Sequence, residues 1–126
     1  MKIARVLICL MGLLLGGFLL TAPCLAKSQA RPPGKPAIYE FGRQTCPVCR
    51  RMAGILKDID AKYPGQITVR FVYIETEEPL FTKYRVSIVP TQVFLDASGR
   101  EVSRHAGPLS QEKLVNKLKE LKFIKD

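Results

Sequence analysis

The sequence predicts one α/β domain with the element order β-α-β-α-β-β-α, in which a four-stranded mixed sheet carries helices on both faces. Apolar, β-branched runs alternate along the chain with segments whose apolar residues recur every three or four positions, which is typical of strands and helices. The last two strands are joined by residues 96–99, a turn in which Gly99 can supply a positive φ. A strand, a helix and a strand in succession favour a right-handed crossover, so the first two strands are expected to be parallel.

The first strand and the first helix are expected on either side of a short loop. Residues 37–41 form an apolar run that Gly42 ends, and Glu40 stands out in this run as a carboxylate. Residues 47–63 have helical spacing, and the Pro-Gly pair that follows stops the helix. The apolar face of this helix is formed by Val48, Met52, Ile55, Leu56 and Ile59.

The second half of the domain is expected to contain three strands and two helices. Residues 67–74 are β-branched and aromatic with apolar side chains on both faces, which predicts a central strand covered on both sides. Acidic residues 75–78 lead into a short helix, a placement that suits the helix dipole. Residues 92–95 and 100–105 are expected to form an antiparallel hairpin, and Ser110 to cap the last helix. The apolar faces of the two helices are formed by Leu80, Phe81 and Tyr84, and by Leu114, Leu118 and Leu121.

Residues 1–26 are predicted to be a secretory signal. Two basic residues precede an apolar stretch that ends in small residues, and this order favours cleavage after Ala26. Two alternatives stay open, namely an uncleaved anchor, because residues 6–26 are long enough to span a bilayer, and a lipoprotein modified at Cys24. In each case the rest of the chain lies outside the cytoplasm, so the protein is expected to be exported, in a periplasmic or other extracytoplasmic location.

The exported part is expected to consist of a flexible linker and one folded domain. Residues 27–36 contain three prolines and one glycine, which predicts a linker, and residues 37–126 form the domain. The formal net charge of +9 would suit nucleic acid or an anionic surface, but export argues against nucleic acid. The charge is therefore interpreted as a solvated surface, which includes the lysines near the C-terminus: Lys113, Lys117, Lys119, Lys122 and Lys125.

The cysteines indicate the chemistry of the domain. Cys9 and Cys24 belong to the export segment, which leaves Cys46 and Cys49, too few and too close together for a stabilising disulfide framework. This pair stands at the start of the first helix, whose positive end favours a thiolate, and the thiolate is the nucleophile in disulfide exchange. We therefore predict a thiol–disulfide exchange site. The cations available to stabilise the thiolate are Arg43, Arg50 and Arg51.

Metal binding and an inert bridge are the alternatives to redox chemistry for this pair. A zinc site needs four ligands, whereas the domain offers two cysteines and the distant His105, which we interpret as a surface residue. We therefore expect no metal and no cofactor. A two-thiolate clamp for a soft ion such as Cu(I), in a binding module without redox turnover, stays open as the second hypothesis.

Taken in order, these motifs resemble the thioredoxin-like family over residues 37–121, in the minimal form of that fold. Cys46-Pro47-Val48-Cys49 follows a strand, and Val89-Pro90-Thr91, about forty residues further on, resembles the family's cis-proline turn. Residues 96–100 resemble its β-hairpin, and Gly107 with Ser110 resembles its approach to the final helix.

The resemblance implies a role for each matching residue. Cys46 would be the exposed attacking thiol, and Cys49 the buried thiol that resolves the mixed disulfide. Glu40, six residues before Cys46, would be a buried acid that moves a proton to or from Cys49, although as a strand residue it could also face water. A substrate strand would pair with the backbone of Val89, beside a cis Pro90. The remaining residues of the two active-site turns are Thr45, Pro47, Val48 and Thr91.

Three positions depart from the family's pattern. Thr45 replaces a tryptophan, the dipeptide between the cysteines is Pro-Val, and Phe71 stands where a lysine usually accompanies the buried acid. The redox direction therefore stays open among reduction, oxidation and isomerisation. The predicted function is that of an exported monomeric thiol–disulfide oxidoreductase that acts on protein thiols and disulfides and on a redox partner protein, with residues 6–26 as a membrane tether in the uncleaved form.

Overall fold

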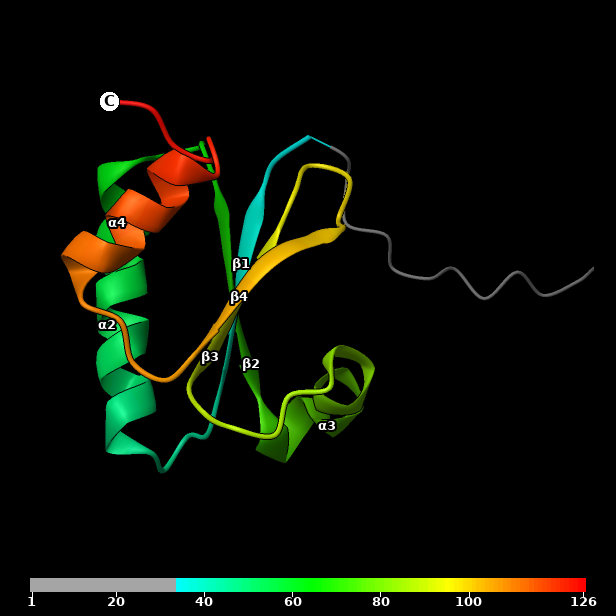
Figure 1. Ribbon diagram of the computed structural model, residues 1–126. Helices are drawn as coiled ribbons and strands as arrows, with labels where there is room; N and C mark the ends of the chain where they lie inside the picture. Colours follow the sequence, from blue (N-terminus) through cyan, green and yellow to red (C-terminus); the bar gives the residue numbers. More distant parts are fainter. Residues whose placement is uncertain (1–33) are drawn as a thin grey trace, which may run out of the picture.

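The computed structural model describes residues 34–126, and the predicted signal at 1–26 and most of the predicted linker lie outside the described residues. The element order is the predicted one, β-α-β-α-β-β-α (Figure 1). The elements are β1 (Ala37–Gly42), α2 (Pro47–Lys62), β2 (Thr68–Tyr73), α3 (Ile74–Tyr84), β3 (Thr91–Leu95), β4 (Glu101–Ala106) and α4 (Gln111–Glu120).

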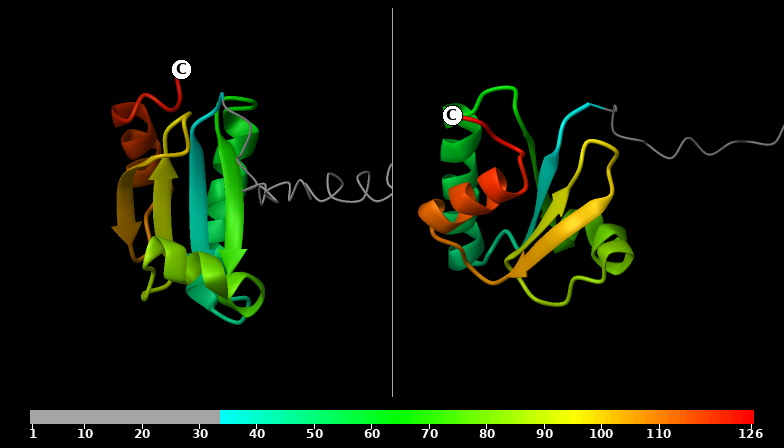
Figure 2. Two further views of the ribbon diagram at one scale, coloured as in Figure 1. Left: turned by 90° about the vertical axis from the view of Figure 1, so that its right-hand side faces the viewer. Right: turned by 45° about the horizontal axis from the view of Figure 1, so that its top comes forward.

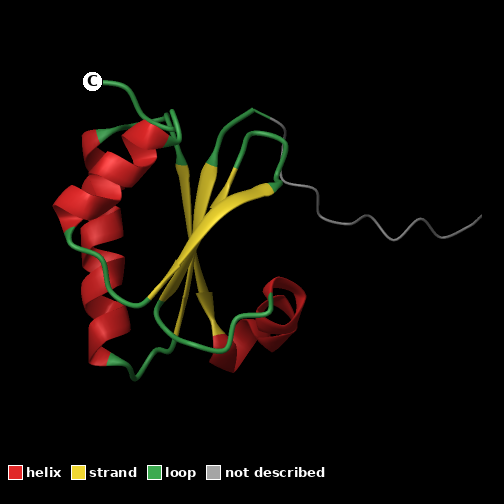
Figure 3. Ribbon diagram, in the orientation of Figure 1, coloured by secondary structure: helices red, strands yellow, loops and turns green. Residues whose placement is uncertain are grey.

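The four strands form one mixed sheet with the order β2-β1-β3-β4. β1 and β2 are parallel, whereas β1–β3 and β3–β4 are antiparallel. Helices α2 and α4 lie against one face and α3 lies at one end of the other face (Figure 3; Figure 2 gives two further views). The predicted fold class, a mixed four-stranded sheet with helices on both faces, is confirmed.

The prediction that residues 67–74 form a central strand is wrong, because β2 lies at the edge of the sheet. Thr68 and Arg70 are exposed, while every residue of β1 and β3 is buried. Val72 of β2 nevertheless packs in the apolar layer under α3, and the Arg70 guanidinium carbon lies 5.2 Å from the centre of the Tyr39 ring on the neighbouring strand β1. The apolar run was also too long for the strand, since Ile74 begins α3.

Local sequence signals explain the other boundaries. The Ser110 side chain accepts a hydrogen bond from the Lys113 N–H and caps α4, as predicted. Gly99 has a φ of +86° in the turn between β3 and β4, where the Asp96 carboxylate accepts hydrogen bonds from the backbone. The sheet ladder begins at Pro36, the last residue of the predicted linker, whose carbonyl accepts from the Thr68 N–H at 2.9 Å.

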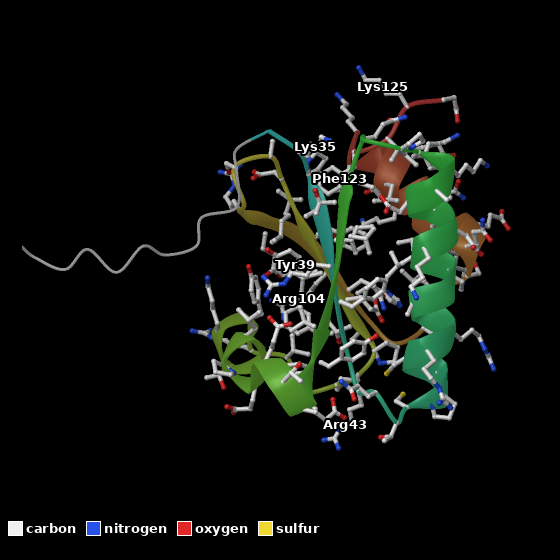
Figure 4. The ribbon with its side chains drawn as sticks, turned by 180° about the vertical axis from the view of Figure 1, so that it is seen from behind. Lys35, Tyr39, Arg43, Arg104, Phe123 and Lys125 are labelled. Carbon is white, nitrogen blue, oxygen red and sulfur yellow. The ribbon has the colours of Figure 1, made fainter. Side chains whose placement is uncertain are left out.

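Two apolar layers lie on opposite faces of the sheet. The layer under α2 and α4 includes Ile38, Leu56, Phe94 and Leu118, and the layer under α3 includes Tyr39 and Phe41. Figure 4 shows Tyr39 and Arg104 on the α3 side. Within residues 34–126, no helix is both long enough and apolar enough to cross a membrane.

Truncation of Leu118 tests the larger layer. Leu118 is fully buried on α4, so Leu118→Ala is expected to lower the free energy of unfolding by about 2–5 kcal/mol, from lost burial and the cavity left behind. Urea unfolding measures this change. Asn116→Ala on the exposed side of the same helix is the matched control, and an equal loss in both variants would contradict the packing described here.

Candidate active site

Cys46 occupies the N-cap of α2, at the end of the sheet where β1 finishes. Its backbone is extended (φ −83°, ψ 114°) and Pro47 takes the first helical turn, where a missing N–H costs nothing. The Cys46 sulfur accepts a hydrogen bond from the Cys49 N–H at 3.2 Å. A sulfur therefore stands where a serine or aspartate oxygen usually caps a helix, and a negative charge on it is favoured by the free N–H groups.

The two sulfurs are in contact. Both cysteines are free thiols, and the Cys49 S–H donates to the Cys46 sulfur across 2.7 Å. Cys46 is partly exposed, whereas Cys49 is only 3% exposed and is one of the buried residues of α2. Because a disulfide needs sulfurs about 2.05 Å apart, a small side-chain movement is enough to join them. An outside disulfide can reach Cys46 first.

The environment shifts the two thiols in opposite directions. The hydrogen bond from the Cys49 thiol, followed by that from the Cys49 N–H, lowers the pKa of Cys46, and the charge of Arg50 adds to this. Burial, together with the hydrogen bond to Cys46, raises the pKa of Cys49 to about 11. Cys46 is thus prepared to attack as a thiolate, while Cys49 keeps its proton until a base removes it.

The arginines predicted to assist Cys46 contribute unequally. Arg50 lowers the pKa of Cys46 through its charge, whereas a backbone hydrogen bond with Arg43 partly offsets the raised pKa of Cys49. The Arg43 carbonyl also accepts from the Cys46 N–H at 3.3 Å, which shapes the turn. Arg43 lies on the loop between β1 and α2, at the end of the molecule that carries the cysteines (Figure 4). Arg51 is exposed on the second turn of α2, one turn further from the cysteines' end of the helix.

The Val89–Pro90 turn lies beside the cysteines. Its peptide bond is cis, and the Gly107 N–H donates to the Pro90 carbonyl at 2.8 Å. Thr91 is opposite Phe41 in the β1–β3 ladder, so Pro90 comes next to Gly42. A Cβ at Gly42 would lie 3.1 Å from the Cys49 Cβ, which places this end of β1 directly against Cys49.

The backbone and side chains of this turn leave a surface free for a partner. The Val89 N–H and carbonyl make no hydrogen bond to any part of the chain that the structure describes. The Thr91 hydroxyl donates to the Ile88 carbonyl at 2.7 Å and holds the turn from inside. Ile88 is 59% exposed, and Val48 between the cysteines is 36% exposed. Sequence reasoning missed Ile88, whose only signal was an apolar residue that belongs to no strand or helix.

Glu40 is buried, so the alternative in which it faces water is wrong. Its side chain is 3% exposed on β1, and neither carboxylate oxygen has a hydrogen-bond partner among the described residues. Burial raises the pKa of Glu40 to about 8, and the neighbouring Gln92 side chain opposes part of that rise without a hydrogen bond of normal geometry. Its charge in turn contributes to the raised pKa of Cys49. Its role in proton transfer stays a prediction.

The other residues around the cysteines lie on the active-site turn or on the neighbouring strands. Thr45 and Pro47 are exposed beside Cys46. His105 lies on β4 opposite Gln92 and is half-buried, whereas the sequence suggests an exposed surface residue. Gln92, a fully buried residue next to Glu40, was not identified from the sequence. In the part of the chain covered by the structure, His, Cys, Asp and Glu side chains do not gather in any group of three that could hold a metal.

The buried carboxyl predicts an unusual pH dependence of stability. Because the pKa of Glu40 is about 8 in the folded chain, against an ordinary value of 4.5, the folded chain keeps a proton that the unfolded chain releases. The free energy of unfolding should therefore fall as pH rises through this window, by at most about 1.4 kcal/mol per unit, and should level off above it.

Urea unfolding of the wild type and Glu40→Gln across this pH range measures the effect. Glu40→Gln should flatten the slope, whereas Asp60→Asn, at an exposed position of α2, should leave it unchanged. The assignment of a buried, protonated Glu40 fails if the slope survives in Glu40→Gln.

Comparisons with known proteins agree with this geometry. A family model described as a thioredoxin-like domain matches residues 25–122. The thioredoxin-like protein HCF164 of Arabidopsis thaliana chloroplasts is 29% identical over 104 residues, which cover 81% of this chain and 40% of that protein. The thiol:disulfide interchange protein TxlA homolog of Synechocystis is 28% identical over 76 residues, which cover 59% of this chain and 42% of that protein. The chain thus spans about two fifths of the length of these relatives.

Solved structures give the same result. Thioredoxin O2 of Arabidopsis thaliana in its oxidized state has a TM-score of 0.62 and 26% identity, over 75% of this chain and 81% of that one. The germline-specific thioredoxin Deadhead of Drosophila melanogaster has a TM-score of 0.63 and 29% identity, over 69% of this chain and 81% of that one. Since the family model matches most of the sequence, the chain belongs to the thioredoxin-like family.

Proposed function

We propose that this protein is an exported thiol–disulfide oxidoreductase that exchanges disulfides with protein substrates or with a redox partner protein. The observation that carries the proposal is the contact between two free thiols at a helix N-terminus, 2.7 Å apart, one partly exposed with a lowered pKa and one buried with a raised pKa. The thioredoxin-like relatives support a thiol–disulfide oxidoreductase type of function.

The exchange proceeds in two successive thiol–disulfide exchange steps. The Cys46 thiolate attacks one sulfur of a substrate disulfide, forms a mixed disulfide and releases the other substrate sulfur as a thiolate, which takes up a proton. Cys49 then loses its proton and attacks the Cys46 sulfur, which closes the Cys46–Cys49 disulfide and releases the second substrate thiol. The substrate gains two electrons from the protein and two protons. One proton is that lost by Cys49, and the other comes from the solvent, which received the Cys46 proton when its thiolate formed. The same steps in reverse oxidise a substrate dithiol.

The turn opposite the cysteines is proposed to hold the substrate. The unpaired backbone of Val89 can bond an extended segment of the substrate, next to Pro90 and Thr91. Exposed Ile88 and Val48 offer apolar contacts to side chains beside the substrate cysteine. Thr45 and Pro47, at the surface, complete the rim around Cys46.

Turnover of a test disulfide examines the proposal. The domain should reduce insulin with dithiothreitol as electron source, or oxidise a reduced test protein, and either direction supports it. Absence of exchange in both directions would overturn it. Stoichiometric retention of Cu(I) without any exchange would instead favour the binding module.

Export is proposed from residues 1–26 and is tested separately. Expression of the full chain in a bacterial host should deliver the protein outside the cytoplasm, and mass spectrometry of its N-terminus should find Lys27 first if the signal is cleaved. Recovery in the membrane fraction with residues 6–26 attached would support the tether. A full-length chain that stays in the cytoplasm would contradict export, and gel filtration tests the proposed monomeric state.

A further inference from the structure

Two buried polar side chains face one another on the two central strands. Glu40 of β1 and Gln92 of β3 are cross-strand partners, 3% and 0% exposed. Neither the carboxylate oxygens of Glu40 nor the amide nitrogen and oxygen of Gln92 have a hydrogen-bond partner within residues 34–126. A buried polar group without a partner costs free energy, so such a pair needs an explanation.

Both side chains point toward α2. Alternate residues of a strand share a face, and Ile38 on β1 and Phe94 on β3 belong to the core under α2 and α4. Glu40 and Gln92 therefore lie on that face as well. Gly42, the next residue of β1 on the same face, is the one that abuts Cys49. Glu40 is therefore two residues along β1, on the same face, from the residue that contacts Cys49.

The other neighbours of Glu40 make Gln92 its polar cross-strand contact. Its partner on β2 is Phe71, an apolar ring with the Lys57 ammonium 5.9 Å from its centre. Helix α2 contributes Cys49 to this face, and β4 contributes His105, opposite Gln92. The strands thus place the Gln92 amide between the carboxyl and the imidazole.

We propose that Gln92 is a positioning residue that holds the Glu40 carboxyl group for proton exchange with Cys49. This inference rests on the proposed function. The Gln92 amide suits the task because its NH₂ can donate to the ionised carboxylate and its carbonyl can accept from the protonated acid. In the second step of the reaction, the Cys49 proton passes to the Glu40 carboxylate as Cys49 attacks, and a small rotation lets the Gln92 amide form a hydrogen bond with Glu40 in either protonation state.

Loss of the amide has a defined consequence. In Gln92→Leu the burial of Glu40 remains, but the group that opposes its raised pKa is gone. The pKa of Glu40 should rise further, and a smaller fraction of Glu40 should be ionised at neutral pH. The attack by Cys49 should slow by up to about tenfold for each unit of that rise, while the attack by Cys46 should be unaffected.

Reaction with dithiobis(nitrobenzoate) separates the two attacks. Cys46 releases the first nitrothiobenzoate, and Cys49 releases the second when it resolves the mixed disulfide. Gln92→Leu should slow only the second phase and move its pH profile upward. Phe94→Leu, two residues along the same face of β3, is the matched control that should alter neither the profile nor the ratio of the phases. His105→Asn separates any contribution of the imidazole.

The double variant gives the decisive comparison. In a Glu40→Gln background, Gln92→Leu should cause no further slowing of the second phase, because the two residues act together. Equal slowing with and without Glu40 would overturn the proposal. If Gln92→Leu does not fold, Gln92→Met keeps the length of the side chain and removes the amide.

A direct titration separates this inference from the proposed function. The Glu40 carboxyl carbon can be followed by NMR against pH in the wild type and in Gln92→Leu, whether or not the protein catalyses exchange. An upward shift of the Glu40 midpoint in the variant supports the positioning role. An unchanged midpoint contradicts it even if the wild type is fully active.

Discussion

Replacement of Cys46 by serine is expected to reduce disulfide exchange to the uncatalysed rate. Serine lacks a sulfur and so cannot form a mixed disulfide, and its hydroxyl stays protonated at neutral pH. The first phase of nitrothiobenzoate release and the turnover of insulin should both disappear. Because the Cys46 sulfur is the first that an outside disulfide can reach, we do not expect the buried Cys49 to substitute for it.

The loss in Cys46→Ser should not come from unfolding. Serine is among the best N-cap residues, and its oxygen can accept the hydrogen bond that the Cys49 N–H now gives to the Cys46 sulfur. Urea unfolding should therefore give a free energy within about 1 kcal/mol of the wild type. A folded Cys46→Ser variant that still turns over insulin would contradict the assignment of Cys46 as the attacking thiol.

Replacement of Cys49 by serine is expected to stop turnover at the mixed disulfide. Hydrogen bonds from the Cys49 S–H and N–H lower the pKa of Cys46, and a serine at position 49 can donate the same two hydrogen bonds from its O–H and N–H. Cys46 should thus still attack, but no second thiol can release the substrate. A covalent adduct between the protein and its substrate should accumulate and should be broken by dithiothreitol.

Gel electrophoresis without reductant measures this trap. We expect the adduct in Cys49→Ser, only traces of it in the wild type, and none in Cys46→Ser. The assignment of Cys49 as the resolving thiol fails if Cys49→Ser continues to release substrate, or if the wild type accumulates the same adduct. This trapped species can also be used to isolate natural partners.

The Cys pair and the first helix could be predicted because their signals are local. Pro47 in the first turn and the helical spacing of apolar residues together set the start of α2 and place Cys46 at its positive end. The burial of Glu40 could not be decided in this way. It depends on β1 being an inner strand with neighbours on both sides, which only the order β2-β1-β3-β4 establishes.

The wrong prediction for residues 67–74 and the failure to identify Gln92 and Ile88 also come from contacts between residues far apart in the chain. Residues 67–74 carry apolar side chains on both faces, but an edge strand can also bury such side chains. Val69 and Phe71 pack in the layer under α2 and α4, and Val72 packs in the layer under α3. Gln92 appears in the sequence as an ordinary polar residue in a short strand. Its importance comes from its register opposite Glu40, a contact between residues far apart in the chain. Ile88 likewise gains meaning only from its place in the turn beside the cysteines.

The redox equilibrium of the pair with glutathione is the measurement closest to the central claim. The protein is brought to equilibrium in buffers of varied ratio of reduced to oxidised glutathione, and its free thiols are alkylated and counted by mass. We predict that Cys46 and Cys49 become inaccessible to alkylation together as the buffer becomes more oxidising, in one two-electron transition without bound glutathione. The midpoint of that transition gives the reduction potential of the pair and so sets the direction of the reaction. Thiols that stay free at every ratio, or that separately take up glutathione, would contradict a working Cys46–Cys49 couple.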